Sequence, residues 1–184
     1  MRVISGKLGG RNFDSPPGNR THPMSDKARG ALFNALGDIK GLTVLDAFAG
    51  SGALSFEAIS RGASQVTAID IETSAVTTIR HNAEVLGVED RIKVIRSNAA
   101  GWTKKAPLVE RFDLVLCDPP YDMLQMELVE RLAKRTAWGG LLVLSLPPDA
   151  RVILPESFER LIHKSYGDIE LHFYRHHAPA GREA

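Results

Sequence analysis

The sequence predicts an α/β protein built on an open, mostly parallel β-sheet of seven strands, and three observations support this fold. From Gly41 onward, short apolar runs rich in β-branched residues alternate with stretches of helical periodicity, which is typical of strand–helix–strand units. A glycine-rich loop follows the first of these runs and opens a helix. Only residues 166–168 join the last two runs, too few for a crossover, so we expect an antiparallel C-terminal strand.

The N-terminal segment is expected to be a separate element. Residues 2–13 are two short extended runs around Gly9 and Gly10, which predicts a β-hairpin. The prolines and glycine that follow cannot continue regular structure. We therefore predict a hairpin arm over residues 1–24 and a main domain over residues 25–184.

The main domain is expected to begin with a helix. Ser25 is a good N-cap, Asp26 falls in the first turn, and apolar residues then recur at helical spacing until Gly37. The later elements follow from the same periodicities. Strands are predicted at 43–46, 65–70, 92–96, 112–117, 140–146, 161–165 and 169–175, and helices at about 51–61, 73–86 and 123–136.

Composition excludes several classes of protein. The chain has 184 residues, of which 43% are hydrophobic and 24% charged, as expected for one globular domain with a real core. A single cysteine argues against a disulfide framework, the longest apolar stretches are strand-sized, and no secretion signal opens the sequence. We therefore expect a cytoplasmic protein with no membrane partner.

The net charge of +1 conceals an uneven distribution. Residues 1–30 hold six basic and two acidic residues, or +4, whereas the remainder holds 17 basic and 20 acidic residues, or −3. A basic arm on a mildly acidic body can attract phosphate, although the same pattern also fits a solvated terminus with no partner.

A cofactor site is predicted where the first two strands end, because ligands of parallel sheets bind beyond the carboxyl ends of strands. Asp46 ends the first strand, and Gly50 and Gly52 let the following loop approach a ligand closely. Asp70 ends the second strand, 18 residues beyond Gly52, where an acidic side chain accepts hydrogen bonds from ribose hydroxyls. Asn98, after the third strand, suits an adenine amino group but is also an ordinary turn residue.

Two details of this loop argue against a nucleotide phosphate. Ser55 replaces the third glycine of the dinucleotide pattern, and the Asp46 carboxylate would repel a pyrophosphate. S-adenosylmethionine has no phosphate and carries a sulfonium and an ammonium group, so it is the cofactor that we predict.

The most specific motif is Asp118-Pro119-Pro120-Tyr121, which follows the fourth strand directly. The prolines make a rigid turn in which the Pro119 carbonyl is free to accept a hydrogen bond, Asp118 is a second acceptor, and Tyr121 offers a ring for stacking. Such a site fits a planar base with an exocyclic amino group held for an in-line attack on a methyl group. A proline turn without chemistry is the plainer alternative.

These motifs resemble those of Rossmann-like class I methyltransferases and, more closely, of the RsmD family of 16S ribosomal RNA guanine-N2 methyltransferases. The arm carries the closest resemblance, and the matching segments are 4–6, 10–11, 23–29, 32–34, 48–54 and 60–63. The resemblance implies transfer of a methyl group to guanine N2 in 16S rRNA, free or in the small subunit, by residues 118–121. It also implies a cofactor site of Asp46, Phe48, Ala49, Gly50, Ser51, Gly52, Asp70, Ile71, Asn98 and Ala99. The RNA contacts expected from the arm are Arg2, Lys7, Arg11, Arg20, His22 and Arg29.

The sequence departs from the family at two arm positions, since His22 stands in place of the usual arginine and Gly30 in place of the usual glutamate. Three alternatives also stay open: a DNA adenine or cytosine methyltransferase, a protein glutamine methyltransferase, and an RNA-binding module without catalysis. Cys117 lies in an apolar strand, which favours a packing role over a nucleophile, and His172 and His176 are predicted on a strand and the tail after it, where the helical spacing of metal ligands does not apply, so no metal site is expected. We also expect a monomer.

Overall fold

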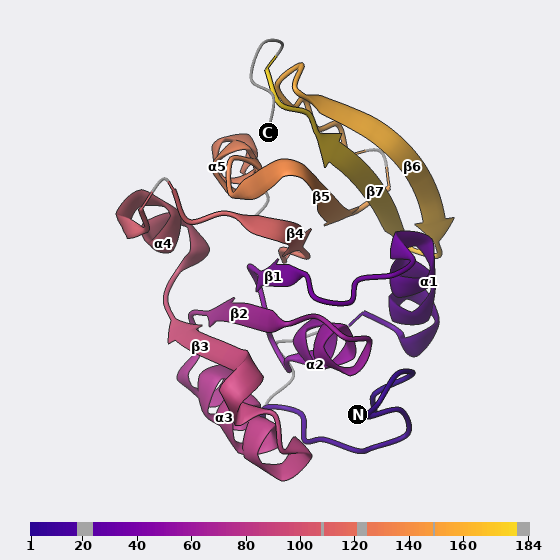
Figure 1. The fold of residues 1–184 in the computed structure, drawn as a ribbon, viewed down its shortest axis with the longest axis vertical. Helices are drawn as coiled ribbons and strands as arrows, with labels where there is room; N and C mark the ends of the chain where they lie inside the picture. Colours follow the sequence, from indigo (N-terminus) through magenta and orange to yellow (C-terminus); the bar gives the residue numbers. More distant parts are fainter. Residues whose placement is uncertain (18–23, 108, 121–124, 149, 180–184) are drawn as a thin grey trace. The chain divides into compact units, whose positions relative to one another are not determined.

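The computed structural model describes residues 1–17, 24–107, 109–120, 125–148 and 150–179 (Figure 1). The chain folds as two compact units, Met1–Ala99 and Ala100–Ala184. Among the helices of the described residues, none is both long enough and apolar enough to cross a membrane.

The first unit contains three parallel strands in the order β3-β2-β1 (Figure 1). They are β1 (Thr43–Asp46), β2 (Gln65–Asp70) and β3 (Ile92–Arg96). In the register Val44 lies beside Val66, and Val66 beside Ile92. These three side chains are buried, as continuous apolar runs in a parallel sheet should be. All three strands end where the sequence predicts.

Helices α2 (Ala53–Ser60) and α3 (Thr73–Leu86) connect these strands and pack against them. Because both crossovers step across the sheet in the same direction and such connections are right-handed, the two helices cover one face. All residues of α2 are buried, which requires a cover on its outer side as well. Part of that cover is Phe13, whose ring lies 5.3 Å from that of Phe56.

The N-terminal segment supplies this cover. It reverses direction over residues 5–10 and pairs antiparallel through one bridge between Arg2 and Asn12, so the predicted hairpin is shorter and its turn longer than the Gly9-Gly10 pattern implies. The segment is fixed to α2 by Glu57, whose side chain is fully buried and accepts the backbone N–H of Ile4 at 2.7 Å. Helix α1 (Asp26–Leu36) then begins at the predicted N-cap, Ser25, and ends at Gly37.

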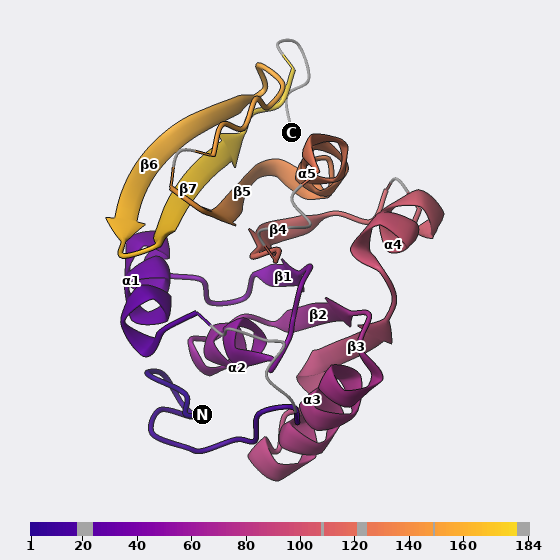
Figure 2. The same ribbon diagram turned by 180° about the vertical axis from the view of Figure 1, so that it is seen from behind.

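The second unit contains four strands in the order β4-β5-β7-β6, and Figure 2 shows β6 and β7 as a long curved hairpin. Strands β4 (Phe112–Cys117) and β5 (Thr136–Leu146) are parallel. Strand β7 (Ile169–His176) is antiparallel to β5 and to β6 (Phe158–Tyr166). Seven strands, mostly parallel with antiparallel C-terminal pairing, confirm the predicted α/β class.

Several elements of this part of the chain differ from prediction, and β6 begins three residues earlier than expected. Helix α4 (Ala99–Lys105) was not predicted, because seven residues that include Gly101 are too few for a clear periodicity. Helix α5 (Met126–Ala133) ends three residues earlier than expected, and β5 begins four residues earlier. Arg135 lies between these two elements, is buried, and donates from its guanidinium to the carbonyls of Thr103 and Pro107.

Candidate functional site

The loop after β1 is organised by a buried carboxylate. Asp46 is 1% exposed and accepts a hydrogen bond from the Ser55 hydroxyl at 2.7 Å. Ser55, the residue that breaks the dinucleotide pattern, therefore holds the end of β1 against α2. Gly52 has φ of 81°, and a Cβ there would lie 2.7 Å from a ring carbon of Phe56. The loop thus requires glycine at this position for conformation and for packing.

The end of β2 is bound to that loop through Asp70. One oxygen of its carboxylate accepts the N–H of Gly50 at 2.7 Å, and the other accepts the N–H of Glu72 at 2.8 Å. The backbone carbonyl of Asp70 accepts the N–H of Ser97, which joins the end of β3 to the same place. The three predicted cofactor segments of the first unit are therefore brought together at the carboxyl ends of its strands.

The remaining predicted cofactor residues differ in exposure. Ile71 is 51% exposed, Asn98 is exposed, and Phe48 is partly buried. The side chains of Ser51, Ala49 and Ala99 are buried, so these residues can contribute backbone groups or packing to the site.

This constellation fits S-adenosylmethionine. A fixed carboxylate at Asp70 keeps lone pairs for ribose hydroxyls, since each of its oxygens accepts only one of the described N–H groups. The exposed apolar side chain of Ile71 follows directly.

In the second unit, the proline motif lies where the sequence predicts, directly after β4. Asp118 is partly buried, Pro119 is buried and Pro120 is exposed. Burial raises the pKa of the Asp118 carboxyl, and the hydroxyl of Ser145 on β5 acts in the opposite direction. Tyr121 lies outside the described residues. Cys117 is buried, which agrees with a packing role.

The predicted RNA contacts divide into exposed and engaged side chains. Arg2 is 67% exposed in its side chain and lies 3.5 Å from Asp26, and Lys7 is exposed. Arg11 donates to the carbonyls of Val85 and Leu86 at the end of α3, where a cation also complements the helix dipole. Arg20 and His22 lie outside the described residues.

Arg29 requires a correction. Its side chain is fully buried and donates to the carbonyl of Arg2 and to Asp26, both at 2.8 Å. A guanidinium in that position organises the arm and presents no charge at the surface, so Arg29 is removed from the set of expected RNA contacts.

Two residues that shape these sites were not predicted as such. Ser145 lies within an apolar strand, 27 positions from Asp118, and Glu57 lies in a helix next to other buried residues. Neither belongs to a local motif, so only the fold brings them to their partners. The only charged residue in the helix Ala53–Ser60 is Glu57, and this is the signal that the sequence offers.

Comparisons with known proteins identify the family of the chain. A family model described as "Conserved hypothetical protein 95" matches residues 1–175. "Ribosomal RNA small subunit methyltransferase D" of Haemophilus influenzae is 28% identical, over 95% of this chain and 93% of its own. The protein of that name from Escherichia coli K12 is 31% identical over 75% of this chain and 69% of its own.

A solved structure shares the whole fold. "Putative methyltransferase yhhF from Escherichia coli" is 29% identical, covers 97% of this chain and 99% of its own, and superposes with a TM-score of 0.85. The fold is therefore that of the class I methyltransferases, and the chain belongs to the Conserved hypothetical protein 95 family, the RsmD family.

Proposed function

We propose that the protein transfers a methyl group from S-adenosylmethionine to the exocyclic N2 of a guanine in 16S ribosomal RNA. The observation that carries the proposal is the partly buried carboxyl of Asp118, followed at once by a rigid proline turn at the end of β4. Relatives named as small-subunit rRNA methyltransferases support the class of substrate. The choice of guanine N2 comes from the resemblance to the RsmD family.

The first unit is assigned to the methyl donor. When bound, S-adenosylmethionine supplies an electrophilic methyl group on its sulfonium. In this proposal Asp70 accepts hydrogen bonds from the ribose hydroxyls, Ile71 contacts the adenine, and Asn98 binds its amino group. The buried pair of Asp46 and Ser55 keeps the glycine loop in place, so that the loop backbone is preorganised for the ligand.

The second unit is assigned to the acceptor base. Asp118 and the Pro119 carbonyl accept the two hydrogens of the guanine amino group, and Tyr121 stacks on the base. This arrangement directs the nitrogen lone pair at the methyl group, so that the nitrogen–carbon bond forms as the sulfur–carbon bond breaks. Positive charge then develops on the nitrogen and is stabilised by the Asp118 carboxylate. One N–H proton leaves to Asp118 or to water.

The arm is assigned to RNA binding, with residues 1–24 as the RNA-binding segment of a methyltransferase domain that spans 25–184. Among the predicted contacts that the structure describes, Arg2, Lys7 and Arg11 are exposed, as phosphate contacts require, and Arg11 also donates to the end of α3. The target guanine has to leave its stack to be reached by the second unit, which is least costly in the loops and ends of RNA.

The experiment is methylation of unmodified small ribosomal subunits with labelled donor, followed by digestion of the rRNA to nucleosides. We expect label in N2-methylguanosine. Label in N6-methyladenosine, in DNA or in a ribosomal protein would contradict the proposal and favour one of the alternative acceptors.

A variant pair tests the role of the proline motif in the same assay. Asp118→Ala should abolish transfer while the affinity for S-adenosylmethionine stays within a few-fold. Asp90→Ala, which removes an exposed carboxylate from the first unit, should leave both unchanged. Loss of donor binding in Asp118→Ala would contradict the acceptor role.

A further inference from the structure

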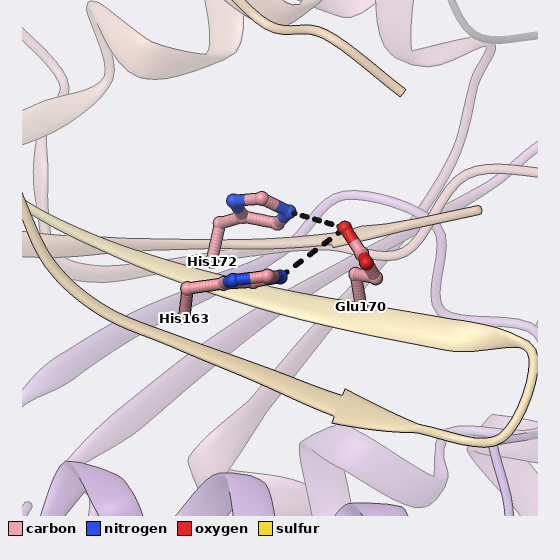
Figure 3. A group of neighbouring side chains, drawn as sticks. All are labelled: His163, Glu170 and His172. Atoms are coloured by element: carbon pink, nitrogen blue, oxygen red, sulfur yellow. Dashed lines mark hydrogen bonds and ion pairs between the residues drawn. The ribbon is translucent and has the colours of Figure 1, made fainter. Parts of the chain in front are cut away.

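Two histidines and a glutamate converge on one point of the β6–β7 hairpin (Figure 3). The Nε2 atom of His163 lies 3.2 Å from Oε2 of Glu170, and Nε2 of His172 lies 3.3 Å from the same oxygen. The two imidazole rings are stacked with centroids 4.5 Å apart. The arrangement is separate from the residues assigned above to the donor and to the acceptor.

A β-bulge brings these side chains to one face. In the register Arg160 lies opposite Tyr174, but Ile162 lies opposite Phe173, so Leu161 is an extra residue in β6. Without it, His163 would face Leu171 and point to the other side of the sheet, because side chains alternate along a strand. With it, His163 lies directly opposite His172, and Glu170 lies two residues from His172 on the same face.

The distances match the geometry of a bound zinc ion. With bonds of about 2.0–2.1 Å, two ligands of a tetrahedral zinc are about 3.3–3.4 Å apart. The two contacts to the Glu170 oxygen, at 3.2 and 3.3 Å, are close to this separation. All three ligand atoms lie within 4.8 Å of one another, and the side chain of His163 is partly exposed.

From this geometry we propose that His163, Glu170 and His172 form a binding site for a divalent transition metal, Zn²⁺, with water as the fourth ligand. Two imidazoles and one carboxylate are the ligand set of many zinc sites that keep an open position. The proposal does not depend on the function proposed above, and it revises the expectation of a protein without a metal.

The surroundings of the three ligands differ. His172 is buried, with its side chain 7% exposed, whereas that of His163 is 43% exposed and gives the ion access from solvent. Burial, followed by the nearby charge of His163, lowers the pKa of His172, and the Arg160 charge acts in the same direction while Glu170 opposes it.

The site would hold the β6–β7 hairpin together beside the carboxyl ends of β4 and β5. His163, His172, Leu144 and Cys117 form one row across β6, β7, β5 and β4. Asp118 follows Cys117, so the metal would lie in the row next to the acceptor motif, two strands away or roughly 10 Å. Bound zinc would hold the two outer strands in register beside that motif.

The test is titration of the full-length, metal-free protein with Zn²⁺ by calorimetry, with Co²⁺ absorption as a report of coordination geometry. We expect one Zn²⁺ per chain at micromolar or tighter affinity, a rise in melting temperature on binding, and the intense visible bands of tetrahedral Co²⁺. No binding up to millimolar Zn²⁺ would overturn the proposal.

Variants localise the site. His163→Ala and Glu170→Gln should each weaken Zn²⁺ binding by more than the roughly 10- to 100-fold that loss of an outer-sphere partner costs. His177→Ala is the matched control, because His177 is an exposed histidine that contacts one carboxylate, Glu159, at 2.8 Å. Equal affinity in His163→Ala and His177→Ala would overturn the proposal and leave a hydrogen-bonded triad. Melting in the absence of zinc shows whether each variant is folded.

Discussion

The fully buried carboxylate of Glu57 accepts the backbone N–H of Ile4 at 2.7 Å, 53 residues away in the sequence. The same side chain accepts the N–H of Ser5 at 3.2 Å and pairs with Arg61 at 2.7 Å. One side chain in α2 thus satisfies two backbone donors of the N-terminal segment. The arm is fixed to the first unit by polar contacts as well as by the packing of Phe13.

Glu57→Ala should lower the free energy of unfolding by about 2–4 kcal/mol, because it removes the acceptor of two backbone N–H groups and the partner of a partly buried guanidinium. Urea denaturation measures the loss, and limited proteolysis should show earlier cleavage within residues 1–17. Glu127→Ala removes the carboxylate of another i,i+4 pair with arginine, but one that is 81% exposed, and should cost at most about 0.5 kcal/mol. Equal losses of unfolding free energy in the two variants would contradict the role of Glu57 in fixing the N-terminal segment to α2.

Arg135 fixes the end of α4. Its guanidinium donates to the carbonyls of Pro107, Thr103 and Ala106 at 2.5, 2.6 and 3.1 Å, and lies 5.3 Å from the ring of Trp102. Arg135→Met keeps the apolar stem and removes these donors, so we expect a loss of about 2–4 kcal/mol of unfolding free energy.

The neighbouring Lys134→Ala is the control for Arg135→Met. Lys134 is exposed, and its loss should change stability by less than about 0.5 kcal/mol. Near-UV circular dichroism of the tryptophans would show a local change around Trp102 in Arg135→Met alone. An Arg135→Met protein as stable as the wild type would return Arg135 to the class of solvated surface residues.

Much of the fold could be predicted from local patterns in the sequence. Strands β1 to β4 and helix α3 have the predicted bounds because each is a clean periodic run ended by glycine or a polar residue. Ser25 and Gly37 likewise mark the ends of α1. These signals lie within a few residues of the structure that they determine, which is why one sequence reveals them.

The features that sequence could not reveal depend on contacts between distant segments. Only the fold brings together the partners in these contacts. They include the buried side chains of Arg29 and Arg135, the contact of Glu57 with Ile4, and the bulge at Leu161. A charged residue is exposed in most proteins, so composition predicts a solvated arginine unless its partners are known. His163 and His172 are similarly nine residues apart on two strands, and only the bulge makes them neighbours.

Asp70→Asn should weaken binding of S-adenosylmethionine at least tenfold, by loss of a charged acceptor for the ribose and of one backbone hydrogen bond that holds the loop. An amide keeps a single acceptor oxygen, whereas both carboxylate oxygens are used here, for Gly50 and Glu72. Calorimetry with the donor or its demethylated product measures the effect. Asp90→Asn is the exposed control, and equal affinities in both variants would contradict the ribose role of Asp70.

Asp118→Asn should make the protein more stable near neutral pH while impairing methyl transfer. The pKa of Asp118 is raised above its ordinary value of 3.8, mainly by burial, so the folded state binds the proton more tightly than the unfolded state does. Stability from this group is therefore present below the unfolded pKa and is lost as pH rises through the folded pKa. The amide does not ionise and escapes that loss.

The measurement is urea denaturation of wild type and Asp118→Asn across the range from about pH 8 down to about pH 4. The stability difference should favour the variant at the high end and narrow as pH falls. Asp38→Asn, which changes an exposed carboxylate, controls for net charge. A difference that is constant with pH would mean that Asp118 ionises without a cost in the folded protein.

The double substitution of Arg2→Ala and Lys7→Ala should weaken RNA binding and flatten its dependence on salt. Removal of one phosphate-binding cation lowers the slope of log affinity against log salt by about 0.7–0.9, so the pair should reduce it by about 1–2. Filter binding of small-subunit rRNA at several salt concentrations measures the slope. Lys40→Ala with Lys93→Ala removes the same charge from exposed positions elsewhere in the first unit and should change the slope less. Equal slopes for the two double variants would mean that the arm acts only through the net charge of the protein.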